Sequence, residues 1–396
     1  MNAKNFYSIR KLTIWGIFLL AVSMIISSGK IFDNTSESEK IAYLISFFLS
    51  GILVFTILKY ISPDKNFGDS KEKKHAIHVY QIPRIGGLAI FLSVFLVSVF
   101  FFNDNREILF FLASATIVFI IGLFEDYTQE LPPILRLIMM SIPVMYILIV
   151  LNGVVYDIYY IKLFFPVALI FTIVSVIGFI NAVNIIDGLN GLSSGIAILG
   201  FSFFLLSTQN PNIELLSGIF LFSTLAFFII NITTGKIFLG DGGSYLLGFA
   251  LGELAVLISN EPYLSPWFPF ALLIYPVWEV LFSIIRRKKQ GKGIMEADKL
   301  HLHTLIYYRY FKKLIKNPVK ANSLASLTIL IVIGILDFIV FTIRENIYLL
   351  TVYTLLFIGL YTYIYSSIVH FKLGKLFAHK KENRKTTFKT LGEMKP

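Results

Sequence analysis

The sequence contains no cysteine, so it forms no disulfide and has no thiol chemistry. Charged residues are also scarce, at 15% of the chain, whereas 56% of the residues are hydrophobic. No soluble domain carries so much apolar surface, which excludes the ordinary soluble classes of enzyme and binding protein. The chain is therefore expected to be an integral membrane protein, in which one helical bundle can use the whole sequence.

Hydrophobic runs recur along the chain, and a helix needs about 20 apolar residues to cross a membrane. We predict an all-α polytopic membrane protein with about 12 transmembrane helices. The runs centre on residues 12–29, 41–58, 85–102, 107–124, 133–151, 163–180, 192–207, 213–230, 243–259, 266–285, 323–343 and 346–367. A count one lower or one higher also fits, because the seventh run is short and the fifth carries Arg136 near its start.

The first run follows Arg10 and Lys11, as the apolar part of a signal peptide would, but the "SSG" after it is a poor cleavage site. We interpret it as a helix. Residues 1–40 then form an additional N-terminal helix with an outside loop, residues 41–370 form the main membrane domain, and residues 371–396 form a basic, partly disordered cytoplasmic tail.

The basic residues predict the orientation. With the N-terminus in the cytoplasm, all but five of the 35 Lys and Arg fall on the inside. This bias supports the helix count, since cytoplasmic loops carry an excess of Lys and Arg. The net charge of +11 is then explained by orientation and by contact with anionic lipids, and nucleic-acid binding is not expected.

Polar clusters gather on the predicted inside face, whereas the outside loops are short and bland. Four inside segments carry acids, amides or histidines: "GLFEDYTQELPP", "NAVNIIDGLNGL", "NITTGKIFLGDGGSYLLG" and "EADKLHLHTL". Ionisable groups beside the hydrocarbon layer are costly, so they indicate function by default. The pattern is typical of an active site at a membrane surface.

The acidic candidates each have a structural alternative. Glu125 and Asp126 could hold a cation or act as a base, or they could simply begin a charged loop. Asp241 lies among glycines, with a helix expected to begin near Ser244 whose free N–H groups would suit a phosphate. A magnesium ligand and a helix N-cap are the two interpretations of Asp241.

The histidines and the central polar stretch leave similar alternatives. His301 and His303 would share a face in an extended segment but not on a helix. Zinc lacks further ligands there, which leaves a surface loop or phosphate contacts beside the basic run 286–289. Glycines in "NAVNIIDGLNGL" could serve tight helix packing, but packing does not explain its four polar side chains, Asn181, Asn184, Asp187 and Asn190.

These segments resemble the motifs of one known family. "NAVNIIDGLNGL" resembles the N-x-x-N-x-x-D-G-x-D-G-L motif of the polyprenyl-phosphate N-acetylhexosamine-1-phosphate transferases. "NITTGKIFLGDGGS", "FEDYTQELPP", "IPRIGGLAI" and "PVWEVLFSIIRR…DKLHLH" are similar to four further motifs of that family, in the same order. The resemblance extends from about residue 41 to residue 367.

The resemblance implies a reaction and its participants. A UDP-N-acetylhexosamine and undecaprenyl phosphate would give a lipid-linked diphospho-sugar and UMP, with Mg²⁺ or alternatively Mn²⁺ as the metal. The site would lie on the cytoplasmic side of a bacterial inner membrane. The product would start a cell-envelope polysaccharide such as O-antigen. A homodimer is one expected assembly. Both reactants are anionic, so a cation must bridge them and stabilise the leaving UMP.

The resemblance also implies roles by position. Asp241 would bind the metal. The other catalytic residues would be Glu125 and Asp126, which would handle the lipid phosphate or make a second metal contact, and Asp187, which would position the nucleotide or the metal. The substrate-binding residues would be Asn184, Asn190, Asn231, Lys236, Phe238, Arg287, His301 and His303, with Phe238 stacking on uracil.

The chain departs from the family pattern at several positions. Glu125, Asn190 and Glu279 each stand where the family usually has Asp, and Thr304 replaces a third histidine. The short histidine run favours the N-acetylglucosamine branch over the muramoyl-pentapeptide branch, and Asn190 suggests a modified amino sugar. A transporter or lipid flippase is the alternative from another class, but it should carry its charges near the membrane midplane.

Overall fold

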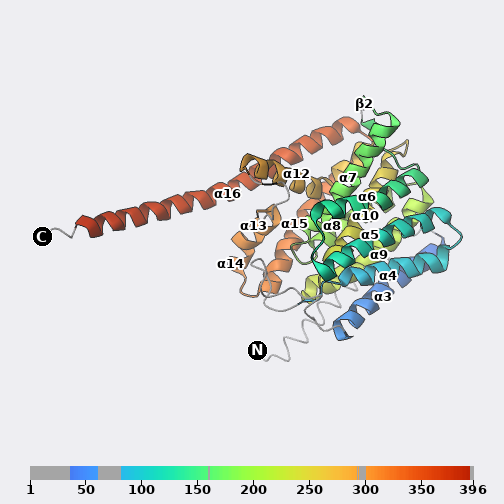
Figure 1. Cartoon of the computed structure of the whole chain (residues 1–396), viewed down its shortest axis with the longest axis horizontal. Coiled ribbons are helices and arrows are strands. Elements are labelled where there is room, and N and C mark those ends of the chain that lie inside the picture. Colours follow the sequence, from blue (N-terminus) through green and yellow to red (C-terminus); the bar gives the residue numbers. More distant parts are fainter. Residues whose placement is uncertain (1–35, 61–81, 159–160, 292, 294–299, 393–396) are drawn as a thin grey trace. The chain divides into compact units, whose positions relative to one another are not determined.

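The computed structural model describes residues 36–60, 82–158, 161–291, 293 and 300–392, and the side chains of these residues up to residue 369. The predicted helix 12–29 lies outside the described residues. The described chain is almost entirely helical (Figure 1). The spanning helices are α3 (Glu37–Tyr60), α4 (Gly86–Phe102), α5 (Arg106–Thr128), α6 (Pro133–Val150), α7 (Phe165–Ile186), α8 (Leu192–Ser207), α9 (Pro211–Thr234), α10 (Gly240–Ser259), α15 (Pro318–Thr342) and α16 (Ile347–Gly392).

Eight of the described helices are long and apolar enough to cross a membrane by length and composition. Helices α4 and α8 are apolar but shorter. This confirms an all-α polytopic membrane protein, while the count of 12 and the side of the membrane on which each loop lies stay predictions.

Helices α9 and α10 form the centre of the bundle. In each, 83% of the most apolar window is buried, against 28–50% in α3, α5, α6, α7 and α15. Helix α10 contacts α5 and α7, and α9 contacts α3 and α8, as Figure 1 shows for this part of the chain. The outer helices leave large apolar side chains exposed, among them Phe55, Ile142, Ile170 and Ile331, as expected for surfaces that face lipid.

Alternate loops gather at opposite ends of the bundle. At one end Asn105 donates a hydrogen bond to Asn212, and Ser265 donates its backbone N–H to Arg344. These contacts join the α4–α5, α8–α9, α10–α11 and α15–α16 connections. The polar segments predicted for the inside face meet at the other end, so the predicted sharing of one face is confirmed within the described residues.

The predicted helix over 266–285 is wrong as a single continuous element. The structure divides it into α11 (Trp267–Leu272) and α12 (Ile274–Lys289), with Leu273 between them at φ −97° and ψ 18°. Pro276 in the first turn of α12 has no N–H to donate to Leu272, so an unbroken helix would lose a hydrogen bond there. This constraint, which hydropathy does not report, favours the break at Leu273.

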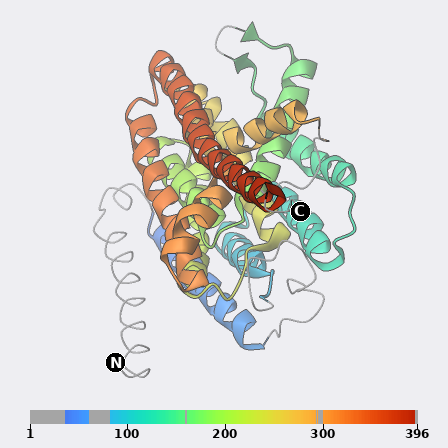
Figure 2. The ribbon, with the colours of Figure 1, turned by 90° about the vertical axis from the view of Figure 1, so that its left-hand side faces the viewer.

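Two further features were not predicted. A short antiparallel hairpin, β1 (Asp157–Ile158) and β2 (Ile161–Lys162), precedes α7 and projects beyond its end (Figure 2). Helix α16 continues through the basic segment to Gly392, so the expectation of a partly disordered tail is replaced by helix. Lys, Arg and Glu are good helix formers, and no proline occurs between Pro318 and Pro396.

Candidate active site

The entry to α4 is fastened to the loop between α9 and α10. Phe238 donates its N–H to Pro83 O, and Gly86 donates to Phe238 O at 2.8 Å. A Cβ on Gly87 would lie 2.2 Å from Gly243 Cα, and Gly240 has φ +79° with Arg84 O beside it. The glycines of "IPRIGG" and "GDGG" therefore let two backbones touch, which brings Arg84 to the start of α10.

Asp126 caps α10. Its Oδ1 accepts the N–H of Asp241 and its Oδ2 accepts the N–H of Gly242, both at 2.9 Å. Helix α10 begins at Gly240, so the predicted start near Ser244 is wrong. The N–H groups expected to be free for a phosphate are in part taken by Asp126, because a buried carboxylate satisfies orphan helix donors well.

Two arginines surround Asp241. Arg84 Nη2 lies 3.5 Å from Asp241 Oδ1, and Arg136 Nη1 lies 3.9 Å from Oδ2. Arg136 also reaches Glu125 Oε1 at 3.3 Å and donates to the Tyr245 hydroxyl at 3.0 Å. Glu125 Oε2 accepts the N–H of Leu131 at 3.1 Å, so Glu125 holds the α5–α6 turn together with Arg136.

Asp187 joins this cluster from the end of α7. It interacts electrostatically with Arg84, Asp241 and Asp126. Loss of water around its carboxyl raises the pKa of Asp187 well above its ordinary value, and the positive charge of Arg84 opposes that rise. Nearby, Ser244 Oγ donates to Asn184 Oδ1 at 3.0 Å, which ties α7 to α10 one turn before Asp187.

Asn190 and Asn231 are buried, with 2% and 3% of their surface exposed. The N–H of Asn190 donates to Asn322 Oδ1 of α15 at 2.6 Å, and its amide lies 3.4 Å from Ser323 Oγ. Asn231 donates to Ile237 O in the α9–α10 loop. Both side chains pack between neighbouring segments in this structure, and the substrate contacts predicted for them stay predictions.

The histidines share one side of their segment. His301 and His303 have nearly parallel rings 5.6 Å apart, because His301 is extended and precedes α13 (Leu302–Ile306). His301 Nδ1 lies 3.1 Å from Glu279 Oε1. Burial lowers the pKa of His303 to about 4, so His303 is neutral at pH 7 and binds an anion only as a hydrogen-bond donor.

His303 also lies against the central stretch. A Cβ on Gly188, the residue after Asp187, would be 3.0 Å from His303 Nε2. The histidine segment therefore meets the acidic cluster through Gly188. The side chain of Lys236 is exposed and Phe238 is half-buried, while Arg287 Nε donates to Ser283 O within its own helix.

The carboxylate cluster fits a magnesium ion bound in part by substrate. Among the described residues no group of three His, Asp or Glu is placed to hold a metal by itself. Mg²⁺ commonly uses one or two carboxylates with substrate phosphates and water. Asp241 suits that use: its side chain is 15% exposed and its nearest cations are 3.5 and 3.9 Å away. Asp126 suits it less, since both of its oxygens already accept N–H groups.

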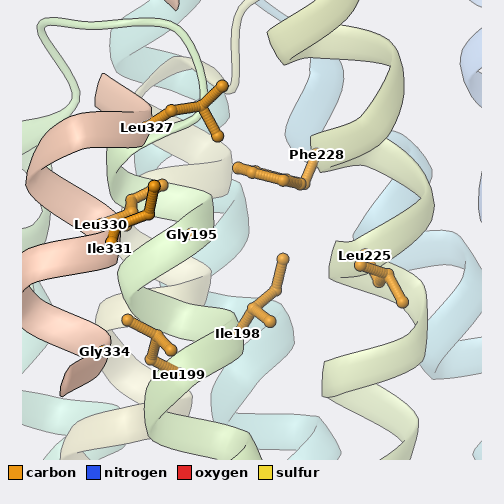
Figure 3. A pocket seen from close by; sticks show the side chains of 9 residues that line it. All are labelled: Gly195, Ile198, Leu199, Leu225, Phe228, Leu327, Leu330, Ile331 and Gly334. Carbon is orange, nitrogen blue, oxygen red and sulfur yellow. The ribbon is translucent and has the colours of Figure 1, made fainter. Parts of the chain in front are cut away.

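An apolar pocket of about 340 Å³ lies between α8, α9 and α15 (Figure 3). Its lining has no ionisable side chain and includes Gly195, where a Cβ would lie 2.4 Å from Leu330. Gly195 therefore allows close packing of α8 against Leu330 of α15. The pocket supplies no group for the chemistry considered above.

Sequence reasoning gave no role to Arg84, Arg136 or Tyr245. Arg136 lay in an apolar run and was treated as a weak point of a helix. An arginine inside such a run is itself a signal of function, because the charge needs a partner. Arg84 stood within a quoted motif, and only the fold shows that the loop places it over Asp241.

Comparisons with known proteins agree with this geometry. A family profile described as glycosyl transferase family 4 matches residues 108–259, which include the acidic pair, the central stretch and Asp241. A probable undecaprenyl-phosphate N-acetylglucosaminyl 1-phosphate transferase of Bacillus subtilis is 29% identical over 276 residues, covering 66% of this chain and 75% of the relative. A phospho-N-acetylmuramoyl-pentapeptide-transferase of Staphylococcus saprophyticus is 29% identical over 289 residues, covering 66% and 88%.

The same type of pentapeptide transferase from Staphylococcus aureus is 28% identical over 290 residues, covering 66% of this chain and 88% of the relative. Residues 108–259 carry three of the five motifs in the order that the resemblance requires, and the fold brings these motifs to one end of the helical bundle. These matches support the resemblance of the chain to the polyprenyl-phosphate N-acetylhexosamine-1-phosphate transferases, and residues 108–259 are similar to glycosyl transferase family 4.

Proposed function

We propose that the protein transfers an N-acetylhexosamine-1-phosphate from a UDP-sugar to undecaprenyl phosphate and releases UMP. The observation that carries this proposal is the cluster of Asp126, Asp187, Asp241, Arg84 and Arg136 at one end of a membrane bundle. The activities in the names of the bacterial relatives support it. The positive-inside bias of the sequence supports a cytoplasmic location for this end, where a nucleotide sugar is available in a bacterial cell.

The chemistry is an in-line phosphoryl transfer. An oxygen of the lipid phosphate attacks the β-phosphorus of the donor, the bond from that phosphorus to the bridging oxygen breaks, and UMP leaves with the electron pair. The lipid phosphate is already largely ionised, so a protein base is not required. Arg84 and Arg136 neutralise charge beside Asp241, and such fixed charges lower the barrier when negative charge shifts to the leaving group.

Mg²⁺, when bound, would supply positive charge that stabilises the leaving UMP. Asp241 is the residue we assign to it, with Asp187 beside it. Asp126 acts by fixing the backbone of Asp241 and Gly242, so the carboxylate of Asp241 is aimed by a buried hydrogen-bonded cap. His303, as a neutral imidazole beside Gly188, would donate a hydrogen bond to the sugar or phosphate.

The N-acetylglucosamine donor or a related amino sugar is our first choice, because the histidine run is short and a Bacillus relative carries that activity in its name. The muramoyl-pentapeptide donor is the second candidate, because the staphylococcal relatives match at 28–29% identity. The test is purified protein with undecaprenyl phosphate, Mg²⁺ and a panel of radiolabelled UDP-sugars. UMP release with a labelled lipid supports the proposal and identifies the donor. Absence of turnover with every donor, in protein shown to be folded, overturns it.

A further inference from the structure

Arg84 lies where several anionic groups meet. Its Nη2 is 3.5 Å from Asp241 Oδ1 and its Nε is 4.0 Å from Asp126 Oδ1. Arg84 also interacts electrostatically with the carboxyl group of Asp187. The side chain is 30% exposed, so a guanidinium with five donors reaches both the carboxylates and the open side of the site.

Hydrogen bonds of its neighbours fix the backbone of Arg84, whereas its guanidinium lies at ion-pair distance from Asp241 and Asp126. The neighbouring Pro83 and Gly86 hydrogen bond to Phe238, and Arg84 O packs against Gly240. The two described ion pairs of Arg84 are longer than a hydrogen bond. Arg136 differs, because the hydroxyl of Tyr245 at 3.0 Å and Glu125 at 3.3 Å hold it in place.

Among the described residues of the cluster, carboxyl groups outnumber guanidiniums. Glu125, Asp126, Asp187 and Asp241 lie around Arg84 and Arg136. A divalent cation would offset this excess. It would also repel Arg84, whose guanidinium stands 3.5 Å from the carboxylate oxygen that the metal needs.

We propose that Arg84 is a positioning residue with two alternative partners: it neutralises Asp241 in the absence of metal, and it turns to the phosphate oxygens of the donor when a metal occupies Asp241. This inference rests on the proposed function. A planar guanidinium suits both partners, because carboxylate and phosphate each accept two parallel N–H groups. The same side chain would then neutralise Asp241 in the metal-free site and bind the donor phosphates in the metal-bound site.

The test uses the full chain purified in detergent, with Arg84→Gln and Arg344→Gln as a matched pair. Arg344 is also 30% exposed and pairs with a carboxylate, Glu345, at 3.7 Å, but at the opposite end of the bundle. Mn²⁺ affinity without substrate is measured by electron paramagnetic resonance. UMP affinity at saturating Mg²⁺ is measured by calorimetry, and thermal stability is recorded for both variants.

Arg84→Gln should bind Mn²⁺ about threefold tighter or more, because a competing cation is gone. It should bind UMP about 10-fold more weakly, because a charged hydrogen bond is lost. Arg344→Gln should change neither. The opposite signs separate this role from general disruption, which weakens both affinities. Mn²⁺ affinity that is unchanged or weaker in folded Arg84→Gln, or unchanged UMP affinity, overturns the inference.

Arg84→Lys covers the case in which Arg84→Gln fails to fold. Lysine keeps the charge but not the planar fork, so Mn²⁺ affinity should stay near wild type while UMP affinity falls about threefold. Wild-type affinity for UMP in this variant overturns the phosphate contact. This outcome is distinct from failure of the proposed function. A wild-type protein that is inactive with every donor overturns that function. An active wild type whose Arg84 variants keep wild-type affinities for Mn²⁺ and UMP overturns only the role of Arg84.

Discussion

His301 and Glu279 are joined by a buried hydrogen bond, with imidazole Nδ1 3.1 Å from Oε1 of the carboxylate. The same oxygen accepts the N–H of Leu302 at 3.0 Å, and Glu279 has no exposed surface. The carboxylate therefore fixes the orientation of the ring and favours the tautomer with the proton on Nδ1. Nε2 of His301 is the nitrogen left for a ligand.

Glu279→Gln should lower kcat/KM about 10-fold while the protein stays folded, because the amide keeps the shape but loses the charge that orders His301. Steady-state kinetics with the best donor measure the effect. Glu345→Gln, at the opposite end and 69% exposed, is the control and should match wild type. Glu279→Asp, which restores the usual residue of the family, should retain more activity than Glu279→Gln. Full activity in Glu279→Gln contradicts a positioning role.

Asp126→Asn should be destabilising, in contrast to Asp241→Asn. An Asn amide has one acceptor oxygen, so it cannot serve both the Asp241 and Gly242 N–H groups, and one buried donor is orphaned at a cost of about 2 kcal/mol. Asp241→Asn should abolish turnover with little change in thermal stability. Tryptophan-fluorescence melting and the UMP-release assay together give both readouts. Equal melting temperatures for Asp126→Asn and wild type would refute the capping role.

Gly240→Ala should disrupt the site, whereas Gly291→Ala should not. Both glycines have positive φ, at +79° and +68°. A Cβ at 240 would lie 2.0 Å from Arg84 O, but a Cβ at 291 meets nothing within 4 Å among the described residues. Gly291→Ala therefore costs only the left-handed strain of about 1 kcal/mol. Gly240→Ala adds a backbone clash that moves Arg84, so activity and melting temperature should both fall. Equal behaviour of the two variants would argue against the close approach.

The sequence predicted the spans well because hydrophobic length is a local property. The runs 41–58 and 107–124 lie within α3 and α5. Counting spans also placed the polar loops at one end. The partners within that end could not be predicted, since Asp126 caps N–H groups 115 and 116 residues away. The site roles of Arg84 and Arg136 were also not predicted, because the positive-inside rule counts every arginine only as a signal of orientation.

The neutral state of His303 predicts a pH effect on stability. Burial lowers its pKa from 6.5 to about 4, so the unfolded chain takes up a proton before the folded one does. The stabilising contribution is complete above pH 6.5 and is lost as the pH falls towards 4, by about 1.4 kcal/mol per pH unit. Between pH 7 and pH 5 the melting temperature of wild type should drop relative to that of His303→Gln, because the raised pKa of Asp187 affects both proteins alike. His303→Gln should show a smaller drop, and an identical pH profile would contradict a buried neutral imidazole.

Asn190→Asp should test whether this departure from the family motif sets donor choice or packing. Asn190 is 2% exposed, and no described residue hydrogen bonds to its Oδ1. A carboxylate there would be a buried charge whose side-chain hydrogen-bond neighbour among the described residues is Ser323 Oγ, which costs about 3 kcal/mol. We expect a lower melting temperature and an unchanged order of donor preference. Asn152→Asp, on an exposed residue that also has positive φ, is the control and should melt like wild type. A stable Asn190→Asp protein with altered donor preference would instead place position 190 in the substrate site, and the buried contact with α15 would then have to open when substrate binds.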